Sequence, residues 1–248
     1  MRDRITDLAT SGYCPSCGTT HSLEQGVARR YCLELIETLE AHGRIDLHVP
    51  EKDADPRLTL DYLQGEARGQ MFGVLECLDA DGRTVILKAF SGQYNGIWEV
   101  PGWAPPLFDT GRFHSLVFDG DKEIKALGRR IDGLPEGAQR RELIRRRKRL
   151  SQQLMKAIHA LYRVPNFRSE VKSLSEFYAN GIPTGAGDCC APKLLNAAVQ
   201  LKLRPKRLAE IFWGRTNRSG TRRQGEFYTA CREKCQPILG FMLCGIEG

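Results

Sequence analysis

Nine cysteines give this chain its most distinctive chemistry, and six of them occur in close pairs. The pairs are Cys14 with Cys17, Cys189 with Cys190, and Cys231 with Cys235. The first residues lack the apolar segment of a secretory signal, so we expect reduced thiols and a cytoplasmic location. Close pairs of reduced cysteines are typical of metal sites or thiol chemistry rather than disulfides. The expected cofactor is zinc.

The stretch G-Y-C-P-S-C-G near the N-terminus predicts a zinc knuckle, with Cys14 and Cys17 on one tight turn. Zinc takes four ligands in a structural site, so two more must come from elsewhere. His21 and Cys32 are the local candidates. The distant candidates are the pair Cys231 and Cys235 and the pair Cys189 and Cys190. The competing interpretation is an ordinary turn with two free thiols. We expect a structural role for this site rather than a catalytic one.

The second cysteine pair stands where a helix is expected to begin. The string G-A-G-D-C-C-A-P-K places Pro192 early in that helix, where its missing N–H costs nothing. The helix dipole lowers the pKa of Cys189, which suits a zinc ligand and a nucleophile equally. Cys231 and Cys235 have a C-x3-C spacing, which puts both sulfurs on one face of a helix. We therefore predict that Cys189, Cys231 and Cys235 meet around one metal ion.

Periodicity predicts the elements that position these residues. Apolar residues at helical spacing predict helices over 25–42, 120–132 and 136–163. Two apolar runs joined by Asp81-Gly82 predict a hairpin over 70–92, and residues 207–213 predict a buried strand. These elements predict an α/β (α+β) fold with a small central sheet and helices on both faces. The predicted organisation is a zinc-knuckle element with its first helix at 1–45, followed by an α/β domain at 46–248. A basic helical insertion is expected at about 120–165.

The charge of the chain favours an anionic partner. The formal net charge is +7 and the calculated pI is about 9.0. Six arginines fall within ten residues of the helix predicted over 136–163, with Glu142 as the neighbouring acid. An RNA phosphate backbone would relieve their mutual repulsion, whereas the alternative is a solvated basic face. The predicted RNA-binding residues are Arg140, Arg141, Arg145, Arg146, Arg147, Lys148, Arg149, Arg222 and Arg223. No run approaches the ~18 apolar residues of a membrane span, so no membrane is expected.

Five strings carry a resemblance to a known family. They are G-Q-M-F-G-V-L, A-F-S-G, G-D-C-C-A-P-K-L-L, F-W-G and F-Y-x-A-C-R-x-K-C-x-P-I-L. They resemble bacterial stand-alone proteins related to the N-terminal extension of RluA-type RNA pseudouridine synthases. The resemblance covers nearly the whole chain and implies a role in RNA modification on tRNA or rRNA. The aspartate motif of the synthase is absent, so the chain is not expected to make pseudouridine itself.

A second resemblance is architectural. The order of hairpin, cysteine-bearing helix, strand and cysteine pair is similar to the core of zinc-dependent nucleoside deaminases. This resemblance implies that Cys189, Cys231 and Cys235 hold zinc. The position of the deaminase glutamate is taken by Ala191, the cysteine pair is one residue wider, and the chain ends after the last predicted helix. Asp188 is our candidate to move protons in its place, and Asp188 and Cys189 are the candidate catalytic residues.

Three functions compete on this evidence. The first is a zinc-dependent hydrolase, deaminase-like, that acts on RNA bases. The second is a non-catalytic, zinc-stabilised RNA-binding module that assists an RNA-modifying enzyme. The third is an enzyme with Cys189 or Cys190 as nucleophile, for which His114 or His159 would have to supply the base.

Overall fold

The computed structural model describes residues 8–246, and the chain forms two compact units. The first unit holds the described residues up to Leu107, residues 164–172 and the chain from Pro183 onwards. The second holds residues 108–163 and 173–182. The first unit thus contains the N-terminal element as well as the sheet, and the predicted boundary at residue 45 falls inside it. Strands β5 (Arg163–Pro165) and β6 (Val171–Ser173) pair where the chain passes between the units.

A four-stranded sheet lies at the centre of the first unit. It consists of β3 (Gln70–Leu78), β4 (Thr84–Phe90), β7 (Arg204–Trp213) and β8 (Phe227–Tyr228). Their order is β4-β3-β7-β8, and every neighbouring pair is antiparallel. The predicted hairpin and the predicted buried strand are both present. Gly82 takes a positive φ of 79° in the turn between β3 and β4, as the Asp-Gly signal requires.

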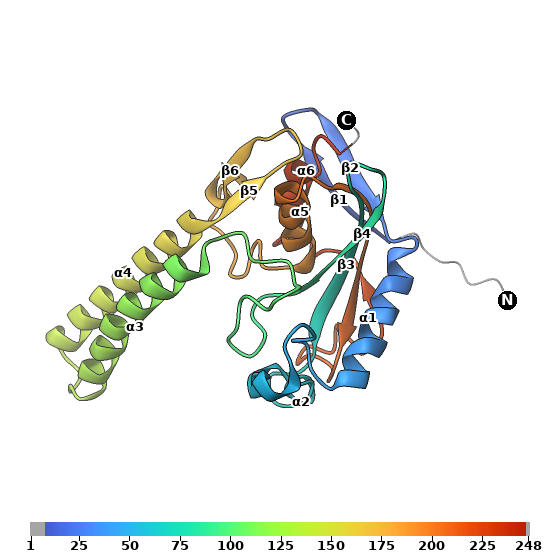
Figure 1. Cartoon of the computed structure of the whole chain (residues 1–248). Helices are drawn as coiled ribbons and strands as arrows, with labels where there is room; N and C mark the ends of the chain where they lie inside the picture. Colours follow the sequence, from blue (N-terminus) through green and yellow to red (C-terminus); the bar gives the residue numbers. More distant parts are fainter. Residues whose placement is uncertain (1–7, 247–248) are drawn as a thin grey trace. The chain divides into compact units, whose positions relative to one another are not determined.

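Helices cover the two faces of this sheet, as predicted (Figure 1). Helix α1 (Ala28–His42) packs on β3 and β7. Helix α5 (Cys190–Gln200) packs on β3, β4 and β7 from the other side. Side chains alternate along β3, so Phe72 and Val74 join the core beneath α1 while Gly73 contacts α5. The α+β class expected from the sequence is confirmed.

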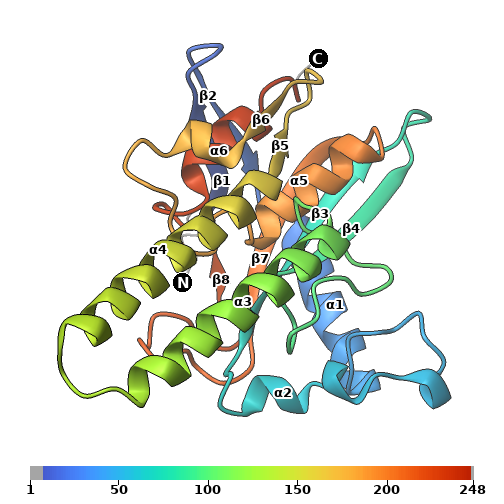
Figure 2. The ribbon, with the colours of Figure 1, turned by 90° about the vertical axis from the view of Figure 1, so that its left-hand side faces the viewer.

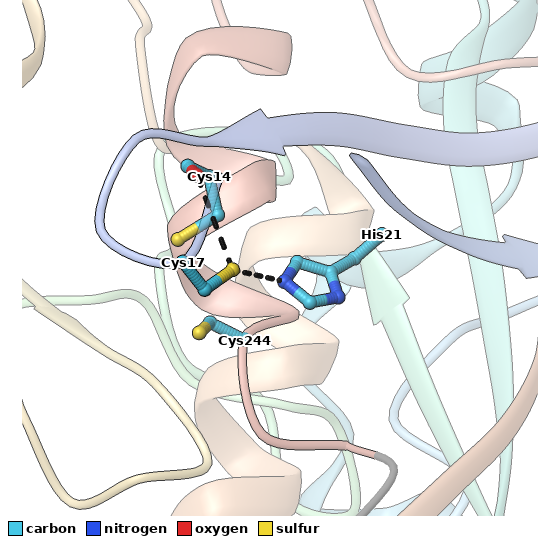
Figure 3. A group of neighbouring side chains, drawn as sticks. All are labelled: Cys14, Cys17, His21 and Cys244. Atoms are coloured by element: carbon cyan, nitrogen blue, oxygen red, sulfur yellow. Dashed lines mark hydrogen bonds between the residues drawn. The ribbon is translucent and has the colours of Figure 1, made fainter. Parts of the chain in front are cut away.

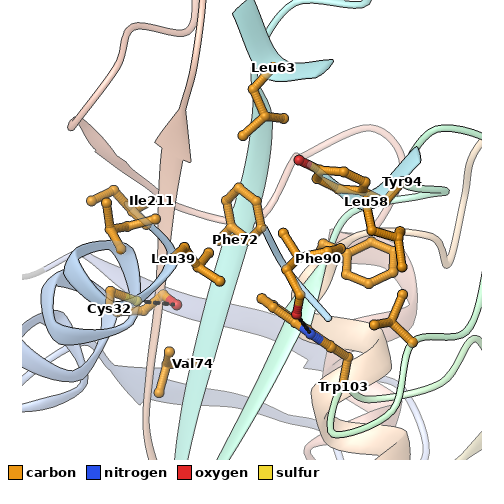
Figure 4. Packing of buried hydrophobic residues seen from close by; sticks show 14 of the residues in the cluster. Cys32, Leu39, Leu58, Leu63, Phe72, Val74, Phe90, Tyr94, Trp103 and Ile211 are labelled. Atoms are coloured by element: carbon orange, nitrogen blue, oxygen red, sulfur yellow. Dashed lines mark hydrogen bonds between the residues drawn. The ribbon is translucent and has the colours of Figure 1, made fainter. Parts of the chain in front are cut away.

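One hydrophobic core lies on the α1 side of the sheet (Figure 4). Cys32, Ile36 and Leu39 of α1 are spaced one turn apart and contact this core. The loop after β4 closes it, because Tyr94 donates a hydrogen bond to the Thr59 carbonyl at 2.8 Å. The remaining short elements of this unit are η1 (Glu51–Asp53), η2 (Pro56–Leu58) and α2 (Asp61–Gln64).

An N-terminal hairpin and a C-terminal helix complete the first unit. The hairpin consists of β1 (Ala9–Cys14) and β2 (Thr19–Glu24), and the helix is α6 (Gln236–Met242). Gly12 of β1 and Gly240 of α6 touch backbone to backbone, so a Cβ atom on either would overlap the other segment. These two glycines let the two ends of the chain meet.

The second unit is a helical hairpin of α3 (Thr110–Asp132) and α4 (Ala138–Leu161), with η3 (Leu174–Phe177) beside α4 (Figure 2). Asp109 caps α3 by accepting a hydrogen bond from the Arg112 amide at 2.7 Å. Leu127, Ile131 and Leu143 form the small buried core of the hairpin. The insertion predicted at about 120–165 is therefore helical, and it begins earlier than expected.

Candidate metal centres

The first candidate centre, here called the four-ligand site, consists of Cys14, Cys17, His21 and Cys244 (Figure 3). Their ligand atoms all lie within 4.8 Å of one another. Cys14 ends β1, Cys17 lies in the turn, and His21 lies in β2. The Gly18 amide donates to the Cys14 carbonyl at 2.9 Å, which closes the turn and holds the two thiols together. This geometry could hold a metal ion.

The electrostatics of the four-ligand site favour a thiolate on the turn. The Cys17 sulfur lies 3.1 Å from Nε2 of His21. Desolvation opposes ionisation of Cys17, but hydrogen bonds from His21 and the Thr19 backbone outweigh it and lower its pKa to about 6. Burial, followed by hydrogen bonds to Cys14 and Cys17, raises the pKa of Cys244 to about 12. A bound cation would favour the thiolate of Cys244 despite its raised pKa.

The structure brings together three of the ligands predicted for this site and leaves out the fourth. Cys32 was a candidate, but its sulfur lies in the core beneath α1 and donates to the Ala209 carbonyl at 3.3 Å. Burial raises the pKa of Cys32 to about 12, so it is a neutral packing residue. Cys244 takes the position instead. The distant candidates Cys231, Cys235, Cys189 and Cys190 are not part of this group.

The second candidate centre, here called the three-ligand site, consists of Cys189, Cys231 and Cys235. The sequence predicted this set, and the three sulfurs lie within 4.8 Å of one another. The sulfurs of Cys189 and Cys231 are 3.6 Å apart. That separation is close to the ~3.8 Å between two thiolates on one tetrahedral zinc, and far from the ~2.05 Å of a disulfide.

Local structure explains how these three sulfurs converge. Cys189 is the N-cap of α5 and Cys235 is the N-cap of α6, so two helices begin at the site. Cys231 precedes α6 in a turn that its carbonyl closes, accepting from the amides of Cys235 and Gln236 at 3.2 and 3.0 Å. The prediction that Cys231 and Cys235 share one face of a helix is wrong. Pro237 in the first turn starts α6 at Gln236, which leaves Cys231 outside it.

Hydrogen bonding among the three sulfurs favours the thiolate on Cys231. Hydrogen bonds from Cys189 and Cys235 lower the pKa of Cys231. Hydrogen bonds to Cys231 and Cys235 raise the pKa of Cys189 well above its usual value. This pattern is that of a thiolate held by two thiols. A divalent cation would displace those two protons and bind three thiolates.

The adjacent thiol, Cys190, does not join the site. Cys190 is fully buried and its sulfur donates to the Met71 carbonyl at 3.3 Å. Burial raises the pKa of Cys190 well above its usual value. His114 and His159 belong to the second unit, whereas Cys189 and Cys190 belong to the first. Cys190 is therefore a buried, neutral thiol of the first unit.

A buried carboxylate beside the three-ligand site was missed by the sequence analysis. Glu210 lies in β7, is 3 % exposed, and accepts a hydrogen bond from the Ala191 amide at 2.9 Å. Burial raises its pKa to about 7, although the Ala191 amide opposes the shift. An acid in the middle of the apolar run L-A-E-I-F was the available signal, because a buried strand rarely carries one.

Asp188 and Lys193 frame the same helix end. Asp188 is half-buried, and its carbonyl accepts from the Gly92 amide at 2.7 Å. Lys193 is fully buried, and its ammonium donates to the carbonyls of Phe90 and Gly92 at 3.0 and 2.6 Å. Burial lowers the pKa of Lys193 to about 8, while Cys190, Asp188 and Cys189 oppose this shift. Lys193 therefore ties the loop after β4 to α5.

The basic residues predicted to bind RNA fall into paired and unpaired groups. On α4, Arg140 pairs with Glu136, Arg146 with Glu123 at 3.2 Å, and Arg149 with Glu142 at 3.5 Å. Within the described part of the chain, four exposed α4 residues of the predicted RNA-binding set form no ion pair. They are Arg141, Arg145, Arg147 and Lys148. Glu142 is therefore not the only acid near the cluster, because Glu136 and Glu123 also reach it.

The other predicted basic residues lie in the loop before β8. The Arg222 guanidinium stacks over the Tyr228 ring at 4.1 Å. The Arg223 amide donates to the Tyr228 hydroxyl at 2.9 Å. Both residues thus help to order this loop, and the Arg223 side chain is exposed.

Comparison with known proteins gives no relative for this chain: no family model, no curated protein and no solved structure matches it. Among residues 8–246, no helix is both long enough and apolar enough to cross a membrane. The function must therefore be argued from the residues themselves.

Proposed function

We propose that this chain is a zinc-dependent, deaminase-like hydrolase that acts on the bases of RNA. The observation that carries the proposal is the contrast between the two cysteine groups. The first offers four ligand atoms, whereas the second offers three among the described residues. Four protein ligands are typical of a structural zinc site, and three with an open position are typical of a catalytic one.

The surroundings of the three-ligand site support the hydrolase. The hairpin of β3 and β4, then α5 with Cys189 at its N-cap, then β7, stand in the order of the deaminase resemblance. Strand β7 lies beside β3, the first strand of the hairpin. The resemblance still departs from deaminases at Ala191 and at the width of the cysteine pair. It therefore supports the class of reaction and not a particular base.

The proposed roles of the residues follow from their chemistry. Cys189, Cys231 and Cys235 would hold the zinc, whose Lewis acidity lowers the pKa of a water molecule at the open position. The N-terminus of α5, whose N-cap is Cys189, would favour the thiolate of Cys189 once the metal has displaced its proton. Asp188 remains our sequence-based candidate for moving a proton. Lys193 would hold the loop after β4 in place rather than take part in the reaction.

The RNA part of the proposal is supported by the unpaired cations of α4. Four exposed positive charges on one helix that form no ion pair with an acid attract a polyanion. RNA, as tRNA or rRNA, is the partner that the family resemblance favours. Each phosphate contact should contribute to the salt dependence of binding.

A second function remains in competition, a non-catalytic zinc-stabilised RNA-binding module. The four-ligand site and the basic helix favour it, because neither needs chemistry. A cysteine nucleophile is the least supported of the three functions. Cys190 is buried, and the Cys189 thiol is hydrogen-bonded to the sulfur of Cys231.

The decisive experiment measures turnover on RNA. Unmodified tRNA and rRNA transcripts are incubated with the zinc-loaded chain, and released ammonia and altered nucleosides are quantified. We expect zinc-dependent loss of base amino groups that Cys231→Ala abolishes and Cys32→Ala retains. RNA binding with a full metal load but without turnover would support the module and overturn the hydrolase.

A matched pair of variants tests the RNA surface. We expect the triple variant Arg141→Ala, Arg145→Ala and Arg147→Ala to weaken RNA binding and to reduce its salt slope by about 2–3. The control removes the paired residues Arg140, Arg146 and Arg149 and should change the slope less, because their charges are already balanced. Equal effects of the two triple variants would contradict a specific role for the unpaired face.

A further inference from the structure

We infer that Glu210 is the proton-transferring residue of the three-ligand site. This inference rests on the proposed function, and it assigns the proton-transfer role to a strand residue instead of Asp188.

Strand β7 places Glu210 at the end of α5 that carries the proposed metal ligand Cys189. Glu210 is opposite Gly73 in the register of β7 and β3. A Cβ atom on Gly73 would come within 2.6 Å of the Cys190 Cβ atom, so only glycine lets α5 approach this closely. That approach brings the Ala191 amide to 2.9 Å from Glu210 Oε1. Ala191 is two residues beyond Cys189, the helix N-cap whose sulfur belongs to the site.

The carboxylate of Glu210 is incompletely satisfied. It is 97 % removed from solvent, yet within residues 8–246 it accepts a single hydrogen bond, from Ala191. Its second oxygen, Oε2, accepts no hydrogen bond from a described residue and is not fully enclosed by protein, so it can accept from a water or a ligand. A ligand or water at the metal site would provide the missing donor.

The capping of α5 does not by itself explain this residue. A serine, threonine or aspartate at the N-cap satisfies a helix amide from the helix itself. Here Cys189 occupies the N-cap and makes no such bond, and an acid from another element reaches the Ala191 amide. In zinc deaminases the acid that moves protons stands near the first metal ligand without being a ligand itself. In this chain Ala191 fills the position of that acid, and its amide donates a hydrogen bond to the Glu210 carboxylate.

The charged and titratable groups that act on Glu210 fit this role. The Cys231 sulfur, on the segment before α6, disfavours its negative charge. Arg222, on the loop before β8, favours that charge. Cys190, on α5, is a neutral buried thiol next to it.

The test uses the full-length chain loaded with cobalt in place of zinc. Cobalt bound to thiolates gives a visible spectrum that reports its ligands, and changes with pH report ionisation at an exchangeable ligand and at groups bonded to it. The four-ligand site has no exchangeable position, so it should not respond. We expect two coupled ionisation steps in the wild type. Glu210→Gln should keep the metal and remove one step, whereas the exposed Glu226→Gln should leave both.

The outcomes separate this inference from the proposed function. If cobalt does not bind to Cys189, Cys231 and Cys235, the hydrolase proposal fails and the role of Glu210 fails with it. If cobalt binds but Glu210→Gln titrates like the wild type, the metal site stands and the inference is overturned. Loss of the step in Asp188→Asn instead would assign the role to Asp188.

A second variant guards against misfolding. Glu210→Asp keeps the charge but shortens the side chain, so it should shift the step rather than remove it. Once an RNA substrate is known, Glu210→Gln should lower kcat by about 10²–10⁴-fold with unchanged metal content. A kcat within a few-fold of the wild type would overturn the inference.

Discussion

Replacing Cys244 with alanine should remove a metal-mediated cross-link between the N-terminal hairpin and the C-terminal segment. Cys244 is the one ligand of the four-ligand site that comes from the C-terminal segment, while Cys14, Cys17 and His21 share the N-terminal hairpin. A metal bound by all four therefore closes a loop of about 230 residues. The chain-entropy relation for a cross-link of this length gives about 5 kcal/mol of stabilisation.

The expected result of Cys244→Ala has two parts. Zinc at this site should bind more than about 100-fold more weakly, because even the loss of a second-shell partner costs 10–100-fold. The free energy of unfolding should fall by about 5 kcal/mol, which is a large share of the 5–15 kcal/mol typical of a whole domain. Zinc per chain is measured by mass spectrometry after a mild chelator, and stability by urea unfolding.

Cys32→Ala is the matched control, since Cys32 was the competing ligand candidate. It removes a buried thiol and its 3.3 Å bond to the Ala209 carbonyl, at a cost of about 1–2 kcal/mol. It should leave the zinc content unchanged. The reasoning is refuted if Cys32→Ala loses a zinc and Cys244→Ala keeps both. The loop argument alone is refuted if Cys244→Ala loses zinc but no more stability than the control.

Three further predictions concern the first unit. Gly240→Ala should lower the free energy of unfolding, measured with urea, by about 1–3 kcal/mol, because its Cβ would overlap the backbone of β1. The control Gly128→Ala on α3, where nothing lies within 4 Å of the new Cβ, should be neutral or stabilising. Burial raises the pKa of Glu210 from the ordinary value of 4.5 to about 7, so the folded state binds this proton more tightly than the unfolded state. The free energy of unfolding of the metal-free chain should therefore fall by about 3 kcal/mol from pH 4.5 to 7. Glu210→Gln should show no such fall; a parallel pH profile would contradict the assignment. Cys189→Ala should lose one zinc while Cys190→Ala keeps both, and metal analysis that gives the reverse would exclude Cys189 as the ligand.

Some features of the fold and site follow from short spacings in the sequence. The turn with Cys14 and Cys17 and the hairpin around Gly82 depend on contacts within a few residues, so the pattern predicts them. The end of α1 is equally local, because Gly43 takes the left-handed conformation that commonly ends a helix. The convergence of Cys189 with Cys231 was also predicted, from pairing and ligand chemistry rather than from any contact rule.

The choice among distant partners was decided by the tertiary structure. Cys32 lies one and two helical turns before Ile36 and Leu39, so its periodicity already indicated a core position, but ligand counting favoured it. Likewise, Glu123 reaches Arg146 only because α3 folds back along α4.

The sequence by itself indicated the β3–β4 hairpin, strand β7, the basic helix and most of the cysteines of the two candidate centres, since these depend on residue type and local period. Only the tertiary structure brought Cys244 to the N-terminal hairpin and Glu210 to the end of α5. Both placements depend on close backbone approaches at glycines. Gly12 and Gly240 permit the first, and Gly73 permits the second. Because these contacts join segments that are far apart in the chain, no local pattern encodes them.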